Sequence, residues 1–324
     1  MGRSLDQIKR PIARELSDFE KRFRETLRSP VPLMDRITYY IAKRKGKQMR
    51  PMFVFLSAKA CGEIRDESFV AASLIEILHT ASLVHDDVVD ESYERRGFFS
   101  INALWKNKIA VLVGDYFLSK GLLIALKHKQ YRILEITSTA VQALAEGELL
   151  QIEKARRLDI DEAVYYEVIR QKTASLIAAA CQAGAASTTQ DEDRLQLMHD
   201  FGEKIGIAFQ IKDDLFDFGL EDIGKPRGID IKEKKMTLPL IHALSQAAKS
   251  QRKHIIRLIK KHSEEPEKVA EVIRFVHDSD GLAYAEKAMY DYRDQAFKLL
   301  HQLPPSASRD GLEALVNYVV ERKY

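Results

Sequence analysis

Two stretches of the chain carry the same spacing of aspartates, and this spacing suits the binding of a divalent cation. The first reads LVHDDVVDES and the second reads QIKDDLFDFG, and each closes a long apolar segment. The six aspartates of these motifs are Asp86, Asp87, Asp90, Asp213, Asp214 and Asp217. Two copies of the pattern Asp-Asp-x-x-Asp rarely occur by chance in a chain of this length.

On a helix, residues four positions apart lie on one face, one turn above the other. Asp86 and Asp90 therefore project side by side, as do Asp213 and Asp217. Like charges at this spacing destabilise a helix by roughly 0.2–0.5 kcal/mol, and burial raises the cost unless a cation lies between them. Mg²⁺ commonly joins one or two carboxylates to a substrate phosphate. The motifs predict Mg²⁺ sites for a phosphorylated substrate, and two solvated acidic helix ends are the alternative.

Basic residues form short clusters elsewhere along the chain. The clusters are KRKGKQMRP with Lys47 and Arg50, ERRG with Arg95 and Arg96, RQKTAS with Lys172 and Thr173, IGKPRG with Lys225, and EKKMTLP with Lys235. Arginine suits bidentate contact with phosphate, and lysine supplies a point charge. Any one cluster alone would be read as a solvated surface. Together with the acidic motifs they indicate two phosphorylated ligands, one held through metal and one held directly by arginine and lysine.

The composition excludes several classes of protein. The chain has 324 residues, of which 45% are hydrophobic and 31% charged, and its net charge is +3. Because basic and acidic residues are interspersed, we expect no nucleic-acid partner. Cys61 and Cys181 lack metal-ligand spacing and are predicted to be reduced, buried thiols of a cytoplasmic protein. The charged N-terminus has no secretory signal, and the apolar segments are short or contain charges, so no membrane span is expected.

Apolar residues recur three and four positions apart over most of the chain, which predicts helices. No proline lies between Pro51 and Pro226, and no stretch alternates with a period of two. The prediction is an almost entirely α-helical protein, with residues 1–324 in one domain because no linker or change of composition divides them. The polar segment 219–235 is predicted to be a lid over the site.

A series of motifs in a fixed order makes the chain similar to a known family. The series reads GKQMRP, ILHTASLVHDDVVDESYERRG, VLVGDYF, AEGELLQ, RQKTASL, GEKIGIAFQIKDDLFDF and GKPRGIDIKEKKMTLPL, between about residue 35 and about residue 320. The chain resembles the trans-isoprenyl diphosphate synthases, and among them the longer-chain polyprenyl synthases of the octaprenyl type. The resemblance implies one large bundle of antiparallel helices around a central cavity, Mg²⁺ as the cofactor, and a homodimer.

The resemblance also implies a role for each candidate residue. The metal ligands would be Asp86, Asp90 and Asp213, holding up to about three Mg²⁺ ions. The catalytic set would add Asp87, Asp214, Asp217 and Lys172. The allylic diphosphate would be bound by Arg95, Lys172, Thr173, Gln210, Lys225 and Lys235, and isopentenyl diphosphate by Lys47, Arg50, His79 and Arg96. A satisfied core histidine is the alternative for His79.

The implied reaction is the head-to-tail condensation of isopentenyl diphosphate with farnesyl or geranyl diphosphate. Ala81 and Ser82 lie one turn before Asp86, where shorter-chain relatives have an aromatic residue. Their small size predicts an open tunnel and a product of about six to eight isoprene units, because one helical turn of about 5.4 Å matches one extended unit. The alternative is that both pack against a neighbouring helix while a deeper residue such as Phe117 blocks the path, with farnesyl or geranylgeranyl diphosphate as the product. Whether the enzyme contacts a membrane transiently while it releases a long product is a question that the sequence leaves open.

Two other functions are alternatives. A class I terpene cyclase uses the same metal-triggered ionisation, but it has no need of an isopentenyl diphosphate site such as Lys47 and Arg50 would form. The regulatory subunit of a two-component prenyltransferase typically lacks the aspartates, whereas this chain has both sets. The chain could still be a catalytic subunit that requires a partner.

Overall fold

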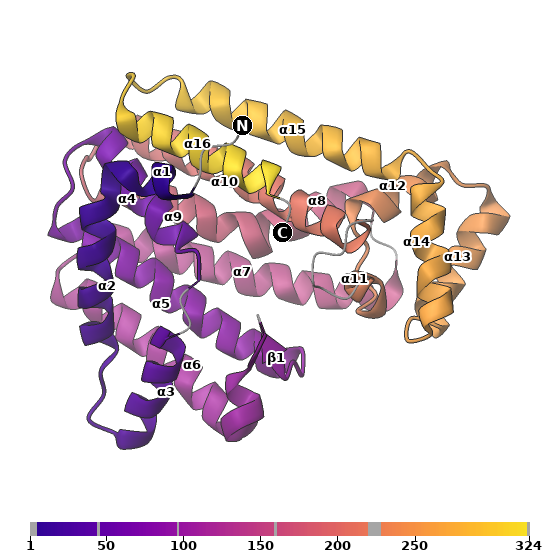
Figure 1. Ribbon diagram of the computed structural model, residues 1–324, viewed down its shortest axis with the longest axis horizontal. Helices are drawn as coiled ribbons and strands as arrows, with labels where there is room; N and C mark the ends of the chain where they lie inside the picture. The colour runs from indigo at the N-terminus through magenta and orange to yellow at the C-terminus, as the bar shows by residue number, and fades with distance from the viewer. Residues whose placement is uncertain (1–4, 44–45, 96, 159–160, 220–227, 323–324) are drawn as a thin grey trace.

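The computed structural model describes residues 5–43, 46–95, 97–158, 161–219 and 228–322 (Figure 1). Within these ranges the regular elements are helices, apart from one hairpin in which β1 (Glu94–Arg95) pairs antiparallel with β2 (Phe98–Phe99). The helices of the first half are α1 (Leu5–Lys9), the 3₁₀-helix η1 (Arg10–Ile12), α2 (Ala13–Leu27), α3 (Pro32–Lys43), α4 (Met49–Cys61), α5 (Asp66–Val89), α6 (Ile101–Lys127) and α7 (Tyr131–Arg157). Those of the second half are α8 (Glu162–Ile169), the π-helix η2 (Arg170–Ala174), α9 (Ser175–Ala186), α10 (Glu192–Asp217), α11 (Ile229–Lys232), α12 (Leu238–Gln246), α13 (Lys249–Lys261), α14 (Pro266–His277), α15 (Gly281–Leu300) and α16 (Ala307–Glu321). The predicted all-α fold is confirmed.

The two helices that carry the aspartate motifs begin at recognisable signals. The side chain of Asp191 caps α10 by accepting hydrogen bonds from the backbone N–H groups of Asp193 at 3.1 Å and Arg194 at 3.3 Å. Asp66 and Glu67 occupy the first turn of α5. Acidic side chains there complement the positive end of the helix dipole. Both helices then run to the aspartates, so each motif lies at a C-terminal helix end.

Close approach of the central helices depends on glycine. A Cβ atom on Gly184 of α9 would lie 2.3 Å from the carbonyl oxygen of Val54 in α4. A Cβ atom on Gly206 of α10 would lie 2.4 Å from the Cα atom of Ala174 in η2. Because neither gap admits a side chain, α9 packs directly on α4, and α10 packs directly on the π-helical turn. This second contact brings Lys172 and Thr173 of η2 beside the second motif.

Different helices form the two ends of the bundle. Figure 1 shows α15 and α16 along one long edge, α13 and α14 at one end, and α2 and α3 at the other. An apolar cluster joins α2 and α3 to α5 and α6, and it includes Leu27, Ile37, Ala81 and Phe117. Helices α2 and α3 therefore pack on α5, the helix that carries the first motif.

Two helices are long and apolar enough to cross a membrane by length and composition, contrary to the expectation from the sequence. The apolar window of α5 has a mean hydropathy of 1.3 and is 61% buried inside the fold. The window of α6 has a mean hydropathy of 1.8 and is 33% buried, so Asp115 and Lys120 do not offset its leucines. Such helices are weak evidence for a span, because core helices of globular proteins have the same composition.

Candidate active site

The first motif lies where α5 ends. Asp86 and Asp87 belong to the last turn of the helix, which ends at Val89, and Asp90 follows it. The backbone N–H of Asp90 donates to the carbonyl oxygen of Asp86 at 2.8 Å, so Asp90 still lies one turn beyond Asp86. Asp87 is only 4% exposed, and its carbonyl oxygen accepts from the side-chain amide of Asn102 at 3.0 Å. Asp86 and Asp90 are the more exposed members of the motif.

The second motif lies wholly within α10, and its middle residue is again buried. Asp214 is 4% exposed, and it accepts hydrogen bonds from the hydroxyl of Tyr165 at 2.6 Å and from the amide of Gln210 at 2.9 Å. Burial, and then the nearby carboxylate of Asp230, raise the pKa of Asp214 to about 8. Tyr165 was not among the predicted residues, because a tyrosine in an apolar helix reads as ordinary core.

Asp217 adds a second carboxyl group with a raised pKa. Its Oδ1 accepts from the backbone N–H of Ile229 at 2.9 Å, which joins α10 to α11. Its Oδ2 is buried and has no hydrogen-bond partner among the described residues. Burial, and then Asp230, raise the pKa of Asp217 to about 7. Asp230 itself was missed by the sequence reading, although it follows the glycine of GKPRGIDIK at the start of α11.

Two predicted lysines lie between the motifs. Lys172 pairs with Glu148 of α7 at 2.5 Å and donates to Gln151 at 3.4 Å. Lys235 lies 3.8 Å from Asp230 and also pairs with Glu233. Burial lowers the pKa of Lys235. The carboxylates of Asp230 and Glu233 raise it by more, so that the pKa of Lys235 is about 12.

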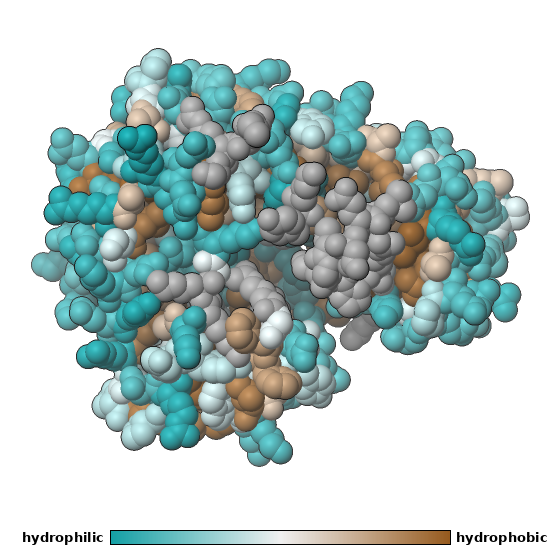
Figure 2. All heavy atoms as spheres, in the orientation of Figure 1, coloured by the Kyte–Doolittle hydropathy of each residue, from teal (hydrophilic) through white to brown (hydrophobic). Residues whose placement is uncertain are grey.

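Electrostatics connect these lysines to both motifs. Burial raises the pKa of Asp90, and the charges of Lys172 and Lys235 partly oppose this rise. Burial also raises the pKa of Asp230. The charges of Lys235 and Lys172 lower this pKa, and the charge of Asp213 raises it. Asp90 of the first motif and Asp230 beside the second therefore share the same cations. Figure 2 shows the molecule hollowed near its middle, below the C-terminus marked in Figure 1.

Thr173 and Gln210, both predicted to bind the allylic diphosphate, form a short chain of hydrogen bonds with Asp214. Thr173 donates to the side-chain oxygen of Gln210 at 2.7 Å, and Gln210 in turn donates to Asp214. Asp213 pairs with Arg322, whose guanidinium lies 4.2 Å from the ring centroid of Phe209. Sequence reasoning missed Arg322 because its role depends on α16 returning to α10. Asp213 is thus paired with the C-terminal region in this structure.

Those residues expected to bind isopentenyl diphosphate that the structure describes lie on α4, on α5 and in the segment before α4. Arg50 is the second residue of α4, which begins directly after Gln48, a residue with a left-handed backbone and φ of 56°. The Nζ of Lys47 lies 5.5 Å from the ring centroid of Tyr318 in α16. The N-terminal end of a helix favours anions, so this position suits a diphosphate. His79 is partly buried in α5.

Several predicted residues are not placed by the structure. Arg96 and Lys225 lie outside the described residues, as do residues 220–227 of the predicted lid 219–235. Arg95 lies in β1, but its side chain is not described. Their roles stay predictions.

The two candidate chain-length residues differ in burial. Ala81 is fully buried in the apolar cluster that contains Phe117, whereas Ser82 is partly exposed and donates to the carbonyl oxygen of His79 at 2.9 Å. This packing is what the alternative interpretation expects of Ala81. The role of both residues in product length stays a prediction.

The donor set fits a hard divalent cation. All candidate ligands are carboxylates, and the buried Oδ2 of Asp217 has no hydrogen-bond partner among the described residues. In the described part of the chain, no three acidic, histidine or cysteine groups lie close enough together to hold a metal ion by themselves. Mg²⁺ usually completes its shell with water and substrate phosphate, so this arrangement suits an ion that is bound together with a diphosphate.

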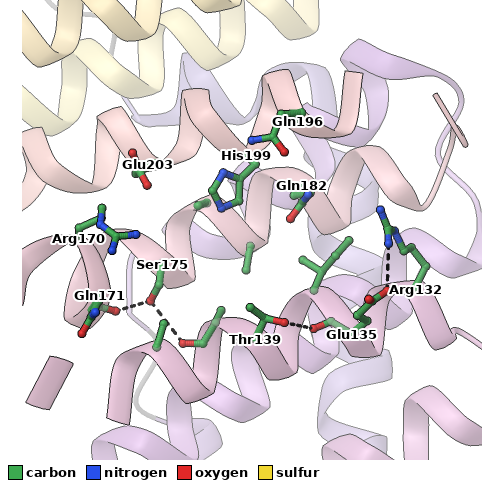
Figure 3. A pocket seen from close by; sticks show the side chains of 15 residues that line it. Arg132, Glu135, Thr139, Arg170, Gln171, Ser175, Gln182, Gln196, His199 and Glu203 are labelled. Carbon is green, nitrogen blue, oxygen red and sulfur yellow. Dashed lines mark hydrogen bonds and ion pairs between the residues drawn. The ribbon is translucent and has the colours of Figure 1, made fainter. Parts of the chain in front are cut away.

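A separate pocket lies away from these residues. It has a volume of about 330 Å³ between α7, α9 and α10 (Figure 3). Arg132, Arg170 and His199 are among its lining residues, and none of the predicted site residues is. Its arginines are neutralised locally, since Arg132 pairs with Glu135 at 3.0 Å and Arg170 with Glu167 at 2.7 Å. We therefore place the candidate active site between the two motifs.

Comparison with known proteins points to one family. A family model described as Polyprenyl synthetase matches residues 31–276. The octaprenyl diphosphate synthase of Escherichia coli (strain K12) is 36% identical over 328 residues, which cover 98% of this chain and 99% of that protein.

Solved structures agree with the sequence match. A decaprenyl diphosphate synthase from Rhodobacter capsulatus superposes with a TM-score of 0.93 at 35% identity, covering 98% of this chain and 99% of the other. A polyprenyl synthase from Caulobacter crescentus CB15, complexed with calcium and isoprenyl diphosphate, superposes with a TM-score of 0.92 at 30% identity, covering 100% and 99%.

Proposed function

This chain belongs to the polyprenyl synthetase family and is an enzyme, and from that premise we propose that it condenses isopentenyl diphosphate head-to-tail with farnesyl or geranyl diphosphate. The product is an all-trans polyprenyl diphosphate, and the reaction requires Mg²⁺. The observation that carries the proposal is the sharing of Lys172 and Lys235 between Asp90 and the carboxylates beside the second motif. Acidic groups on both sides of a cationic centre suit a metal-bound diphosphate.

The residues between the motifs bind and polarise the allylic diphosphate. Asp86, Asp90 and Asp213 would hold the metal, and Mg²⁺ bound there would supply Lewis-acid stabilisation of the diphosphate as it leaves. Lys172 and Lys235 add preorganised positive charge to the same oxygens, and this charge is worth more where water is excluded. In the proposed complex Arg95 and Lys225 contribute further charge. Breaking the C–O bond leaves an allylic cation.

The second substrate is held at the N-terminus of α4. Lys47, Arg50, His79 and Arg96 are its proposed partners. The double bond of isopentenyl diphosphate attacks the allylic cation, and the new cation then loses a proton to the departing diphosphate. A carbocation exposed to water would give an alcohol, so segment 219–235 is proposed to close over the site.

The length of the product is set below the first motif. We propose that the chain passes the small residues Ala81 and Ser82 and reaches about six to eight isoprene units, at about one unit per helical turn. The octaprenyl and decaprenyl names of the relatives support a long product. If Phe117 bounds the tunnel instead, the product is farnesyl or geranylgeranyl diphosphate.

The proposed assembly is a cytoplasmic homodimer of single-domain chains. Six large apolar residues on α6 are between 41% and 63% exposed, namely Leu104, Val111, Leu112, Leu122, Leu123 and Leu126. An apolar helix face of this kind supports self-association, because burying it removes apolar area from water. The free, buried thiols of Cys61 and Cys181 agree with a reducing compartment.

One assay tests the function. The purified chain is incubated with labelled isopentenyl diphosphate, farnesyl diphosphate and Mg²⁺, and the product is sized by reversed-phase chromatography. We expect a product of more than three isoprene units that is lost on chelation of the metal. Conversion of farnesyl diphosphate without uptake of label would indicate a cyclase. Activity that appears only after a partner is added would indicate one subunit of a two-component enzyme.

A further inference from the structure

A second cavity lies between α2 and α3, far along the chain from both aspartate motifs. It has a volume of about 460 Å³, and residues of α2, of α3 and of the connection between them form its wall. The lining residues are Arg24, Leu27, Arg28, Asp35, Thr38, Tyr39, Ala42 and Lys43. None of them has a role in the proposed reaction. We call residues 13–43 the α2–α3 hairpin.

The cavity carries an excess of positive charge. Three cations, Arg24, Arg28 and Lys43, line it with the single carboxylate of Asp35. Among the described residues, none of the three cations makes an ion pair. The pocket in Figure 3 differs, since its Arg132 and Arg170 have glutamate partners. Two guanidinium groups and an ammonium group around one cavity suit a phosphate group.

Large apolar side chains of the α2–α3 hairpin are exposed. Val31 is 56% exposed, Leu33 42% and Tyr39 67%. Val31 lies between Pro30 and Pro32, and proline has no backbone N–H that burial in lipid would leave without a partner. Apolar side chains at a tip with cations behind them match the interface of a bilayer, where acyl chains lie beneath phosphate groups.

The inner side of the hairpin reaches towards the candidate product tunnel. Leu27 lines the cavity and also belongs to the apolar cluster that contains Ala81 and Phe117. A polyprenyl chain that grows past Ala81 would therefore approach α2 and α3 from inside. Figure 1 places α3 at the margin of the molecule, away from α11 and α13.

We propose that the α2–α3 hairpin docks this protein on a bilayer containing anionic phospholipid. Arg24, Arg28 and Lys43 contact lipid phosphates, and Val31 and Leu33 enter the interfacial layer. The inference rests on the proposed function only for the identity of the cargo, a long apolar product that is insoluble in water. The docking itself requires neither substrate nor metal.

Vesicle binding tests the charged part of this proposal. The full chain is sedimented with vesicles of phosphatidylcholine, with or without about one third phosphatidylglycerol, at about 0.1 M salt, where screening is moderate. The variant Arg24→Ala/Arg28→Ala/Lys43→Ala is compared with Lys253→Ala/Arg257→Ala/Lys260→Ala. The second set removes the same charge from the exposed face of α13.

We expect the wild-type chain to bind the anionic vesicles. Each basic residue near such a surface changes partitioning about fivefold, so the hairpin variant should bind at least about tenfold more weakly. The α13 variant should stay within about threefold of wild type. No binding to anionic vesicles, equal binding to neutral vesicles, or an equal loss in the α13 variant would each overturn the proposal.

A fluorescence measurement on the wild-type chain covers the case in which the hairpin variant fails to fold. Trp105 is the single tryptophan, and its ring lies 5.2 Å from that of Tyr40 in α3. Anionic vesicles with brominated acyl chains should quench it, and Val31→Ser/Leu33→Ser should reduce the quenching. Binding without any quenching would show that another face docks.

The condensation assay separates this inference from the proposed function. Without vesicles, the hairpin variant should keep the wild-type rate with water-soluble substrates. A wild-type chain that binds vesicles but condenses nothing would refute the proposed reaction while leaving the docking surface intact.

Discussion

The two aspartate motifs share a spacing, and the fold treats their middle residues alike. Asp87 and Asp214 are both 4% exposed, whereas the outer aspartates of each motif are partly exposed. A buried carboxyl group requires hydrogen bonds or a proton. The middle carboxyl groups are therefore held inside the fold, and the outer positions remain accessible to a ligand.

The surroundings of the motifs differ. Asp90 lies beyond the end of α5 and is close to lysines that oppose the rise of its pKa. Asp217 lies within α10 and is close to Asp230, which raises the pKa of Asp217 further. A cation that binds at the second motif would therefore compete with protons on Asp214 and Asp217.

The helices also differ one turn before each motif. Ala81 and Ser82 precede Asp86, whereas Ala208 and Phe209 precede Asp213. Phe209 is covered by the guanidinium of Arg322. Space for a growing chain is thus expected along α5 and not along α10. Four experiments would break or sharpen this comparison.

The largest effect is expected from the outer aspartates. Asp86→Asn and Asp213→Asn should each lower kcat/KM about 10³-fold, because metal-assisted charge stabilisation supplies several kcal/mol. Initial rates at saturating Mg²⁺ measure the loss. Asp294→Asn on the exposed side of α15 is the control and should stay near wild type. A loss under about tenfold at either motif would show that it does not hold the metal.

Product length tests the difference between the helices. Ala81→Phe should shorten the product by at least about one isoprene unit, since the ring occupies about one turn of the tunnel. Reversed-phase chromatography of the products measures this. Ser82→Ala, which keeps the site small, should give the wild-type distribution. An unchanged distribution in Ala81→Phe would mean that the chain does not pass this residue.

Stability against pH tests the proton held by Asp214. Its pKa is about 8 in the folded chain and ordinarily 3.8, so the folded state binds a proton that the unfolded state releases. The metal-free chain should therefore lose stability as pH rises from about 4 to about 8, by up to about 1.4 kcal/mol per pH unit from this group. The asparagine side chain in Asp214→Asn does not titrate, so the free energy of unfolding of this variant should depend less steeply on pH. Urea unfolding in EDTA at several pH values measures it, and identical slopes would contradict the assignment.

The smallest effect is expected at Tyr165. Tyr165→Phe removes the hydroxyl that donates to Asp214 at 2.6 Å, and should cost about 1–2 kcal/mol of the free energy of unfolding. Tyr166→Phe is the matched control on the same helix and should cost less. Equal losses in urea unfolding would show that ring packing, and not the hydrogen bond, stabilises the site.

Part of the candidate site could be predicted because it depends on local helix geometry. Asp86 and Asp90, and likewise Asp213 and Asp217, are one turn apart on a helix, so their shared face follows from the sequence alone. The helical fold follows from apolar spacing and from the absence of proline between Pro51 and Pro226.

Only the tertiary structure decided which distant groups meet. Asp230, Tyr165 and Arg322 reach the second motif because α11, α8 and the end of α16 pack on or near α10. These contacts join residues between 12 and 109 positions apart in the chain. Periodicity along one helix determines its own faces, but it carries no information about which other helix will cover them. The candidate ligand residues could therefore be named from the sequence, whereas the groups that affect their pKa values and ion pairs depended on packing.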